Sequence, residues 1–289
     1  MMKLASWGEK FRYWRYHTFG DEEWLRVLLD SIEGKARVPM PSFPPDELQA
    51  TFVGMSNEMA IRDGWNFYMF MADRRSKCGL VLDHRTHVLD FGCGWGRLAR
   101  LFLRDVPAAN IWCADSYPLA LELCRDTGVP GHLVQLQQMP PSQLPTEQFD
   151  LAFAYSVFSH LSPTAHLAWR DEFARVLKPG ALVFVTTQAR WFLDQCQYMR
   201  DNPAARTHPW HELLAKSFVD HEESLARFDR GELLYSPTGS GPSFAPEFYG
   251  EAIVPRAFFE SQWCTRFEVL EYIADRSRCE QAVVVMRKR

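Results

Sequence analysis

Several features that define other protein classes are missing from this sequence. No run of about 18 apolar residues occurs, so we expect no membrane-spanning segment. Every apolar run in residues 1–24 is broken by a charge within a few positions, so we expect no signal peptide. There is no internal repeat or low-complexity tract, and the balance of 47% hydrophobic and 24% charged residues excludes a disordered or fibrous chain.

The cysteines also lack the pattern of a disulfide framework. Their number is odd, they are scattered along the chain, and no two have C-x-x-C spacing. Unpaired cysteines of this kind are typical of a reducing compartment, so we expect a cytoplasmic protein. The seven cysteines are Cys78, Cys93, Cys113, Cys124, Cys196, Cys264 and Cys279.

A basic excess is absent as well. Lysine and arginine number 32 against 36 acidic residues, which gives a net charge of −4. Nucleic-acid binders usually carry a basic excess or stripe, so we expect no nucleic-acid partner. The basic and aromatic segment Phe11–Tyr16 fits either a local nucleic-acid patch or a packed helical cap, and we favour the cap.

The N-terminal part of the sequence predicts a helical region. Apolar residues recur at helical spacing over 7–17 and 21–32, with Asp21 as the expected cap of the second helix. A proline-rich connector follows, and Pro45 begins a helical turn. A long helix is predicted from about Ser56 to Lys77, capped by Ser56 or Asn57. We expect residues 1–80 to form a helical N-terminal cap on a core over 81–289.

From residue 87 on, short apolar strands alternate with amphipathic helices. This alternation indicates a parallel sheet with helices on both faces. Strands are predicted within residues 87–91, 110–116, 132–137, 149–157 and 181–188, and helices over 98–103, 116–128 and 162–180. An insertion over 190–250 contains one or two helices, and two strands near the C-terminus form a hairpin at the sheet edge.

The strongest chemical signal is the segment DFGCGWGR at residues 90–97, which we call the glycine loop. It lies where a strand ends and a helix begins, so glycines let the backbone approach a ligand near the positive end of the helix dipole. A dinucleotide site would read G-x-G-x-x-G. Here the third glycine, Gly96, comes one position early and Arg97 takes its place, which argues against NAD or FAD.

Acidic and polar residues follow the next strands. Asp115 closes the second strand, where a carboxylate can accept both ribose hydroxyls of a nucleoside or, alternatively, cap the next helix. Asp150 begins the fourth strand, whose carboxyl end is rich in serine and histidine. Ligands of open α/β sheets bind at this edge.

These motifs together resemble the class I S-adenosylmethionine-dependent methyltransferases. The resemblance rests on VLDFGCGWGR, IWCADS, FDLAFAYSVFSHL and EFARVLKPGALVFVTT over residues 87–188, and extends loosely to the terminal hairpin. The segment over 54–71 resembles the N-terminal part of a bacterial small-molecule subgroup. The implied fold is α/β: a Rossmann-like, seven-stranded, mostly parallel sheet with an antiparallel terminal hairpin, a helical N-terminal cap and a helical insertion before the hairpin.

The resemblance also implies a set of cofactor-binding residues. The loop for the methionine part of S-adenosylmethionine is Asp90, Gly92, Gly94 and Gly96. Asp115 would bind the ribose, with Ser116 and Tyr117 beside the adenine. No acid is present where many family members contact the adenine amino group, so Gln138, next to Met139, is the expected replacement. Tyr155 and Ser156 match the floor near the methyl group, and Arg97, Trp65 and Tyr68 are candidates for the cofactor carboxylate or a lid.

Candidates for catalysis and metal binding are fewer. His160 follows the fourth strand and suits a general base, although it also fits a packing or capping role; Tyr155 is grouped with it as a catalytic candidate. His208, His211 and His221 lack convincingly spaced further ligands, so we expect no metal site. Tyr235, Tyr249 and Glu251 flank a glycine-rich loop and either close over a substrate or lie on the surface.

The sequence therefore predicts a methyltransferase that moves a methyl group to an O, N or C nucleophile of a small-molecule acceptor, mainly by positioning the reactants. The 10 tryptophans and the 14% aromatic content favour a partly apolar acceptor pocket. Two alternatives stay open: a peptide or protein acceptor, and a cofactor-binding partner subunit without catalysis. The oligomeric state is left open.

Overall fold

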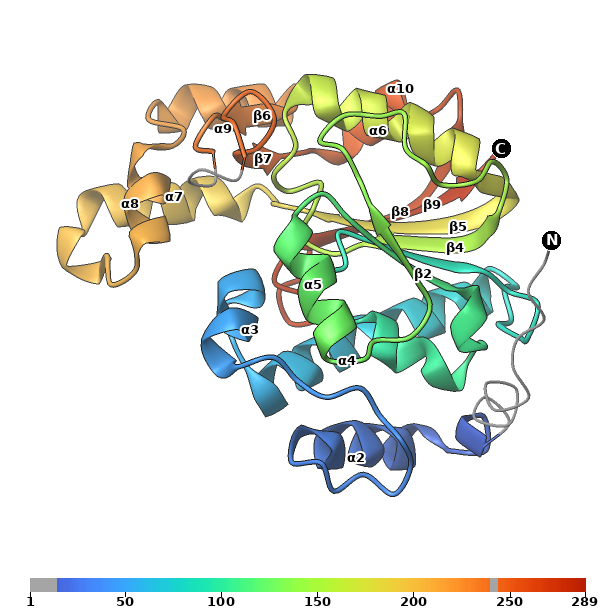
Figure 1. The fold of residues 1–289 in the computed structure, drawn as a ribbon. Coiled ribbons are helices and arrows are strands. Elements are labelled where there is room, and N and C mark those ends of the chain that lie inside the picture. The colour runs from blue at the N-terminus through green and yellow to red at the C-terminus, as the bar shows by residue number, and fades with distance from the viewer. Residues whose placement is uncertain (1–14, 240–243) are drawn as a thin grey trace. The chain divides into compact units, whose positions relative to one another are not determined.

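The computed structural model describes residues 15–239 and 244–289 (Figure 1). Most of the predicted helix over 7–17, and of the segment Phe11–Tyr16, lies outside the described residues. The chain divides into two compact units, which are described one at a time. The first comprises the residues up to Gln137 with Gln143–Phe153 and Val176–Leu182, and the second comprises Gln138–Ser142, Ala154–Arg175 and Val183–Arg289.

A seven-stranded sheet has the order β3-β2-β1-β4-β5-β9-β8. Strand β1 pairs in parallel with β2 and β4, β2 pairs in parallel with β3, and β8 and β9 form the antiparallel pair at the end. The predicted Rossmann-like fold with an antiparallel hairpin is thereby confirmed. The strands are β1 Val88–Phe91, β2 Ile111–Asp115, β3 His132–Gln135, β4 Phe149–Ala154, β5 Leu177–Thr187, β8 Phe267–Ile273 and β9 Ala282–Lys288.

The first unit carries the N-terminal helices. They are α2 Asp21–Ile32, α3 Asp46–Val53 and α4 Asn57–Lys77, followed later in the chain by η2 Ala108–Asn110 and α5 Pro118–Asp126. The predicted cap at Asp21 is wrong, since Gly20 is the cap and Asp21 is the first helical residue. Acidic side chains fill the first turn of α2, where the positive end of the helix dipole favours them.

A buried polar cluster fixes α3 to the start of α4. Gln49 is fully buried; its amide donates to the Pro44 carbonyl at 2.8 Å, and its side-chain oxygen accepts the Asn57 N–H at 2.8 Å. Asn57 in turn donates to Asp46 at 2.8 Å. These bonds support the left-handed backbone of Asn57, whose φ is 51°. Helix α3 is therefore held in a defined position on α4.

Two predicted elements differ from the structure. The helix expected over 98–103 is the 3₁₀ helix η1, Ala99–Arg104, whose six residues are all buried. The helix expected to end at the Pro179-Gly180 turn is α6, Pro163–Val176, and it ends earlier because strand β5 already begins at Leu177. Lys178, at the start of β5, forms an ion pair of 2.7 Å with Asp150 of β4.

In the second unit, the described residues of the insertion over 190–250 contain three α-helices where one or two were predicted. They are α7 Trp191–Asp201, α8 Pro209–Lys216 and α9 His221–Asp229, with the short η3 Pro203–Ala205 after α7. Helices α7 and α8 lie side by side (Figure 1) and share a buried apolar cluster. A two-stranded antiparallel sheet, β6 Leu234–Ser236 with β7 Glu251–Ile253, and helix α10 Arg256–Gln262 follow.

No helix among the described residues is both long enough and apolar enough to cross a membrane. In the described residues before 81, the helices α2, α3 and α4 come first, and the first strand begins at Val88. The predicted boundary between a cap over 1–80 and a core over 81–289 stays a prediction.

Candidate functional site

The glycine loop follows β1 and bends across the end of β2. The Gly92 N–H donates to the Ala114 carbonyl at 2.8 Å, and Gly92, Gly94 and Gly96 have φ angles of 75°, 53° and 75°. Gly96 has no room for a side chain, because a Cβ there would lie 2.8 Å from a methyl carbon of Val129. Sharp curvature and close packing therefore both require glycine in this loop.

Asp115 links this loop to the turn after β2. One carboxylate oxygen accepts the Gly94 N–H at 2.9 Å, and the other accepts the Tyr117 N–H at 2.8 Å. Burial raises the pKa of Asp115 to about 6, while the bonds from Tyr117 and Gly94 lower it. The cap of α5 is Tyr117, with no side-chain capping bond, so Asp115 does not serve as that cap.

Asp90 provides a buried carboxylate at the start of the loop. It is 2% exposed, and its Oδ2 has no hydrogen-bond partner among the described residues. Burial raises the pKa of Asp90 to about 8, the Ala99 N–H lowers it, Asp115 raises it further and Arg97 lowers it. An unpartnered buried carboxylate oxygen favours a ligand that carries a positive charge or a hydrogen-bond donor.

Arg97 anchors the loop to α4. Its guanidinium donates to Asp63 at 2.6 Å and to the Ala60 carbonyl at 2.9 Å, and only 4% of the residue is exposed. Both partners belong to α4. Arg97 therefore has a structural role within the first unit, whatever further contact it makes with a ligand.

Trp65 and Tyr68 lie on α4 beside the end of η1. The Tyr68 hydroxyl donates to Asp105 at 2.7 Å and accepts from Arg104 at 2.8 Å. The Trp65 ring lies 5.1 Å from the Tyr68 ring. Within the described residues, no hydrogen bond or ring contact joins Trp65 or Tyr68 to the glycine loop. Their role at the cofactor stays a prediction.

Phe52, at the end of α3, is a neighbour of the loop that the sequence did not indicate. A Cβ on Gly94 would lie 3.3 Å from Phe52 Cδ1, and the Phe52 ring lies 5.8 Å from the Tyr117 ring. Phe52 therefore covers Gly94 and contacts Tyr117. No local sequence pattern predicts this contact, because it depends on how α3 packs in three dimensions.

Three buried cysteines lie at the loop in the first unit: Cys93 belongs to the loop, and Cys113 and Cys124 lie beside it. Cys93, Cys113 and Cys124 are buried, and the Cys124 thiol lies 3.3 Å from the Gly94 carbonyl oxygen. Contacts with the thiols of Cys113 and Cys124, together with burial, raise the pKa of the Cys93 thiol. These side chains form an apolar layer under the loop.

In the second unit, His160 is held in a defined orientation. Its Nδ1 lies 2.9 Å from the Gly250 carbonyl oxygen, and its ring stacks on Tyr249 at 4.6 Å with an 8° angle between the planes. A carbonyl only accepts hydrogen bonds, so Nδ1 carries the proton and Nε2 keeps the lone pair. Nε2 lies 3.4 Å from Ser156 Oγ.

The alternative in which His160 caps the next helix is wrong. The cap of α6 is supplied by Ser162, whose hydroxyl accepts the Ala165 N–H at 3.3 Å. Ser156 follows β4 with a left-handed backbone, φ 58°, and its N–H donates to Thr186 at 2.7 Å. Its hydroxyl also accepts from Gln281 at 3.1 Å.

Glu251 lies next to His160 and is 2% exposed. Its Oε1 accepts the Trp210 indole N–H at 2.7 Å, whereas its Oε2 has no hydrogen-bond partner among the described residues. The Glu251 carboxylate lies 3.8 Å from His160 Nδ1. Burial raises the pKa of Glu251, and His160 and Trp210 lower it. Glu251 is thus a buried acid and not a surface residue.

The remaining predicted residues are placed as follows. The Ser116 carbonyl accepts from the Gln135 amide at 3.0 Å in the first unit. In the second unit, the Gln138 carbonyl accepts from Trp169 at 2.9 Å, and Met139 is 40% exposed. Tyr155 is half-buried directly after β4. The roles of these residues stay predictions.

The three histidines of the insertion have local partners. His208 caps α8 by accepting the Trp210 N–H at 3.1 Å, His211 accepts the Thr207 N–H at 3.2 Å, and His221 lies 2.9 Å from Asp194. Within residues 15–239 and 244–289, no group of three or more His, Cys, Asp or Glu side chains is arranged to hold a metal ion.

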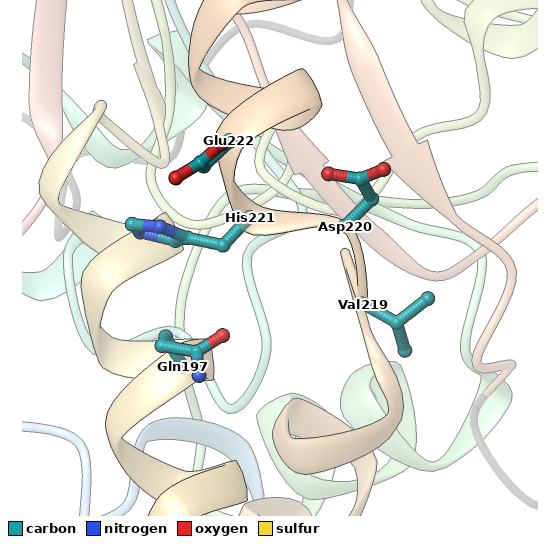
Figure 2. Close-up of a pocket in the computed structure, with 5 residues that line it drawn as sticks. All are labelled: Gln197, Val219, Asp220, His221 and Glu222. Carbon is teal, nitrogen blue, oxygen red and sulfur yellow. The ribbon is translucent and has the colours of Figure 1, made fainter.

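A shallow hollow of about 580 Å³ lies beside α7 and the start of α9 (Figure 2). It is lined by Gln197, Val219, Asp220, His221 and Glu222. Asp220 caps α9 through the Glu223 N–H at 3.0 Å. The polar groups here serve the local fold, and none of the predicted site residues lines the hollow.

Comparison with known proteins identifies the domain. Residues 88–180 match the family described as methyltransferase domain. An S-adenosylmethionine-dependent methyltransferase from Clostridium acetobutylicum has a similar structure, with a TM-score of 0.51 at 13% identity, over 78% of this chain and 92% of that chain. A comparison with curated protein sequences returned no significant match.

Two further solved structures are similar at lower scores. One is a methyltransferase of the same cofactor dependence from Methanosarcina mazei, with a TM-score of 0.45 and 17% identity over 72% of this chain and 94% of that chain. The other is described as the [4+2]-cyclase SpnF, with a TM-score of 0.49 and 16% identity over 99% of this chain and 97% of that chain.

Residues 88–180 are therefore a methyltransferase domain with the class I S-adenosylmethionine-dependent fold, and the predicted resemblance is confirmed. The methyltransferase domain over residues 88–180 supports an enzyme, and S-adenosylmethionine is the expected cofactor.

Proposed function

We propose that this protein transfers the methyl group of S-adenosylmethionine to a small-molecule acceptor. The observation that carries the proposal is Asp115, a buried carboxylate at the end of β2 that is bonded to the Gly94 amide of the glycine loop. A carboxylate that is anchored by backbone N–H groups keeps further lone pairs for the two hydroxyls of a ribose.

The donor set of the first unit fits this cofactor. Asp90 Oδ2 is buried without a partner among the described residues, which suits the ammonium group of the cofactor. The Phe52 ring lies beside Gly94 and is 5.8 Å from the Tyr117 ring, and this pair of rings suits the flat adenine or the apolar edge of the nucleoside. When bound, S-adenosylmethionine supplies a methyl group on a positively charged sulfur.

His160 is the proposed general base. Its Nδ1 is bonded to the Gly250 carbonyl, so Nε2 is the atom that takes a proton from the acceptor. Tyr155 and Ser156 follow the end of β4 at Ala154, and His160 comes a few residues later in the chain. The carboxyl ends of parallel strands are where open α/β sheets bind their ligands.

Aromatic stacking supports a partly apolar acceptor. Phe244 stacks on Tyr249 at 5.1 Å, and Tyr249 stacks on His160 at 4.6 Å, so three rings form a column that ends at the proposed base. A flat or apolar acceptor matches this column. The helical insertion over 190–250 is the segment that we propose shapes the acceptor pocket.

Calorimetry with S-adenosylhomocysteine, the product form of the cofactor, tests the proposal. The wild-type protein should bind it, and Asp115→Ala should weaken binding by about 1.5–3 kcal/mol, the usual scale for hydrogen bonds to a charged group. Asp126→Ala, an exposed residue at the end of α5, is the matched control and should bind like the wild type. Absence of binding to the wild type would refute the proposed function.

A second assay separates the acceptor classes. Transfer of labelled methyl from S-adenosylmethionine is measured with mixtures of small aromatic alcohols and amines and, separately, with peptide libraries. Labelled small molecules support the proposal. Labelled peptides alone would replace it with a protein acceptor, and tight cofactor binding without any transfer would favour a partner subunit.

A further inference from the structure

We propose that Glu251 is a positioning residue that helps to orient His160 and stabilises the positive charge that His160 takes up during the reaction. This inference rests on the proposed function, in which His160 is the general base. It concerns a buried acid that neither the family match nor any local motif assigns to the reaction.

Three consecutive residues hold the imidazole ring. Tyr249 covers one ring face at 4.6 Å, the Gly250 carbonyl fixes Nδ1 at 2.9 Å, and the Glu251 carboxylate lies 3.8 Å from the same nitrogen. The backbone supports this arrangement, because the Gly250 N–H donates to the His160 carbonyl at 2.9 Å. The ring is thus held by one short segment that lies next to it.

Trp210 determines which oxygen of Glu251 is left for His160. The indole N–H binds Oε1 at 2.7 Å, and Oε2 has no hydrogen-bond partner among the described residues. A buried carboxylate with an unpartnered oxygen is costly unless a positive charge forms nearby. Of the two described neighbours that lower the pKa of Glu251, His160 and Trp210, His160 is the one that can take up a positive charge.

His160 becomes positively charged during the methyl transfer, when it takes the proton of the acceptor. An acceptor O–H or N–H proton passes to His160 Nε2, and the acceptor lone pair forms the new bond to the methyl carbon. The carbon–sulfur bond breaks, and its electron pair stays on sulfur. The imidazolium that results lies beside Glu251, whose negative charge stabilises it. Among the described residues, the Tyr249 phenol also faces the His160 ring.

This geometry favours an acceptor that must lose a proton, namely a hydroxyl or a protonated nitrogen. The Ser156 hydroxyl lies 3.4 Å from Nε2 and also accepts from Gln281 at 3.1 Å. The position of the Ser156 hydroxyl shows that a hydroxyl group fits near Nε2 and finds polar partners there. An acceptor hydroxyl beside Ser156 would meet the same imidazole nitrogen.

The test is the rate of labelled-methyl transfer from S-adenosylmethionine to the small aromatic alcohols and amines, measured with the full-length protein. Glu251→Gln keeps an oxygen that accepts from Trp210 but removes the charge that stabilises the imidazolium, so the transfer rate at saturating S-adenosylmethionine should fall about tenfold or more. Glu247→Gln, an exposed residue on the same segment, is the matched control and should transfer at the wild-type rate. An unchanged rate in Glu251→Gln would overturn the inference.

A second measurement on the wild-type protein does not depend on any variant. Nitrogen chemical shifts of the uncharged His160 ring should show the tautomer with the proton on Nδ1, and the opposite tautomer would overturn the inference. Glu251→Gln should bind S-adenosylhomocysteine like the wild type. Failure of the wild type to bind that ligand refutes the proposed function, whereas an unchanged transfer rate in Glu251→Gln refutes only the role of Glu251.

Discussion

Replacing Gly96 with alanine tests how tightly the glycine loop is packed. The backbone there has φ 75°, and the new Cβ would lie 2.8 and 2.9 Å from the two methyl carbons of Val129 and 3.2 Å from the Cys124 sulfur. Gly79, after α4, offers a matched control. It has φ 77° and is exposed, and a Cβ there would meet nothing within 4 Å.

The difference between the two variants isolates the packing cost. Alanine in a left-handed conformation costs about 1–2 kcal/mol at either position. Gly96→Ala adds an overpacking cost of about 1–3 kcal/mol, because Val129 is buried and its branched carbon has no free space to move into. We therefore expect Gly96→Ala to lose roughly 2–5 kcal/mol and Gly79→Ala about 1–2 kcal/mol.

Thermal unfolding measures both values. For a chain of this size, each kcal/mol corresponds to a change of about 2 °C in Tm, so Gly96→Ala should melt roughly 4–10 °C below the wild type and Gly79→Ala about 2–4 °C below it. Gly96→Ala should also weaken S-adenosylhomocysteine binding, which Gly79→Ala should not. Equal melting temperatures of the two variants would refute the argument that Val129 and Cys124 confine the loop.

Three further predictions concern the two units separately. The affinity for S-adenosylhomocysteine should fall as the pH drops below about 6, because protonation of Asp115 removes the charged acceptor; Asp115→Asn should abolish this pH dependence. Phe52→Ala should weaken the same binding by about 1.5 kcal/mol, roughly tenfold, through loss of apolar contact, whereas the exposed Thr51→Ala should not, and equal affinities by calorimetry would remove Phe52 from the site. Burial lowers the pKa of His166 to about 3, below its unfolded value, so His166 contributes stability that is complete above about pH 6.5 and is lost as the pH falls towards 3. His166→Gln, which keeps an acceptor for the Trp263 indole N–H, should flatten the fall of Tm between pH 7 and pH 4, and an unchanged slope would contradict this account.

The features that sequence analysis predicted correctly depend on local pattern. The glycine loop, the acid after β2 and the alternating strands each follow from short-range chemistry, such as the left-handed backbone that Gly92 and Gly96 supply. The prediction that Asp21 caps α2 was wrong because a sequence does not distinguish an acid at the cap from an acid in the first helical turn. Helix ends are the least certain part of such predictions.

The contacts that the sequence did not reveal join distant segments. Phe52 reaches Gly94 because a buried Gln49 cluster fixes α3, and Glu251 meets His160 because a later segment pairs with residues after β4. Such contacts depend on tertiary packing, and no spacing along the chain encodes them. Glu251 carried one weak signal, an acid in an otherwise apolar strand, EAI.

The layer of thiols beneath the loop makes the motion of the loop measurable. Cys93, Cys113 and Cys124 are shielded from solvent, whereas Cys264 is exposed. A maleimide or iodoacetamide label should therefore modify Cys264 at once and reach the three shielded sulfurs only when the backbone above them opens. The labelling rate of those sulfurs, measured by mass spectrometry, would report how often the loop opens. A slower rate in the presence of a bound nucleoside would show how much the ligand reduces that opening.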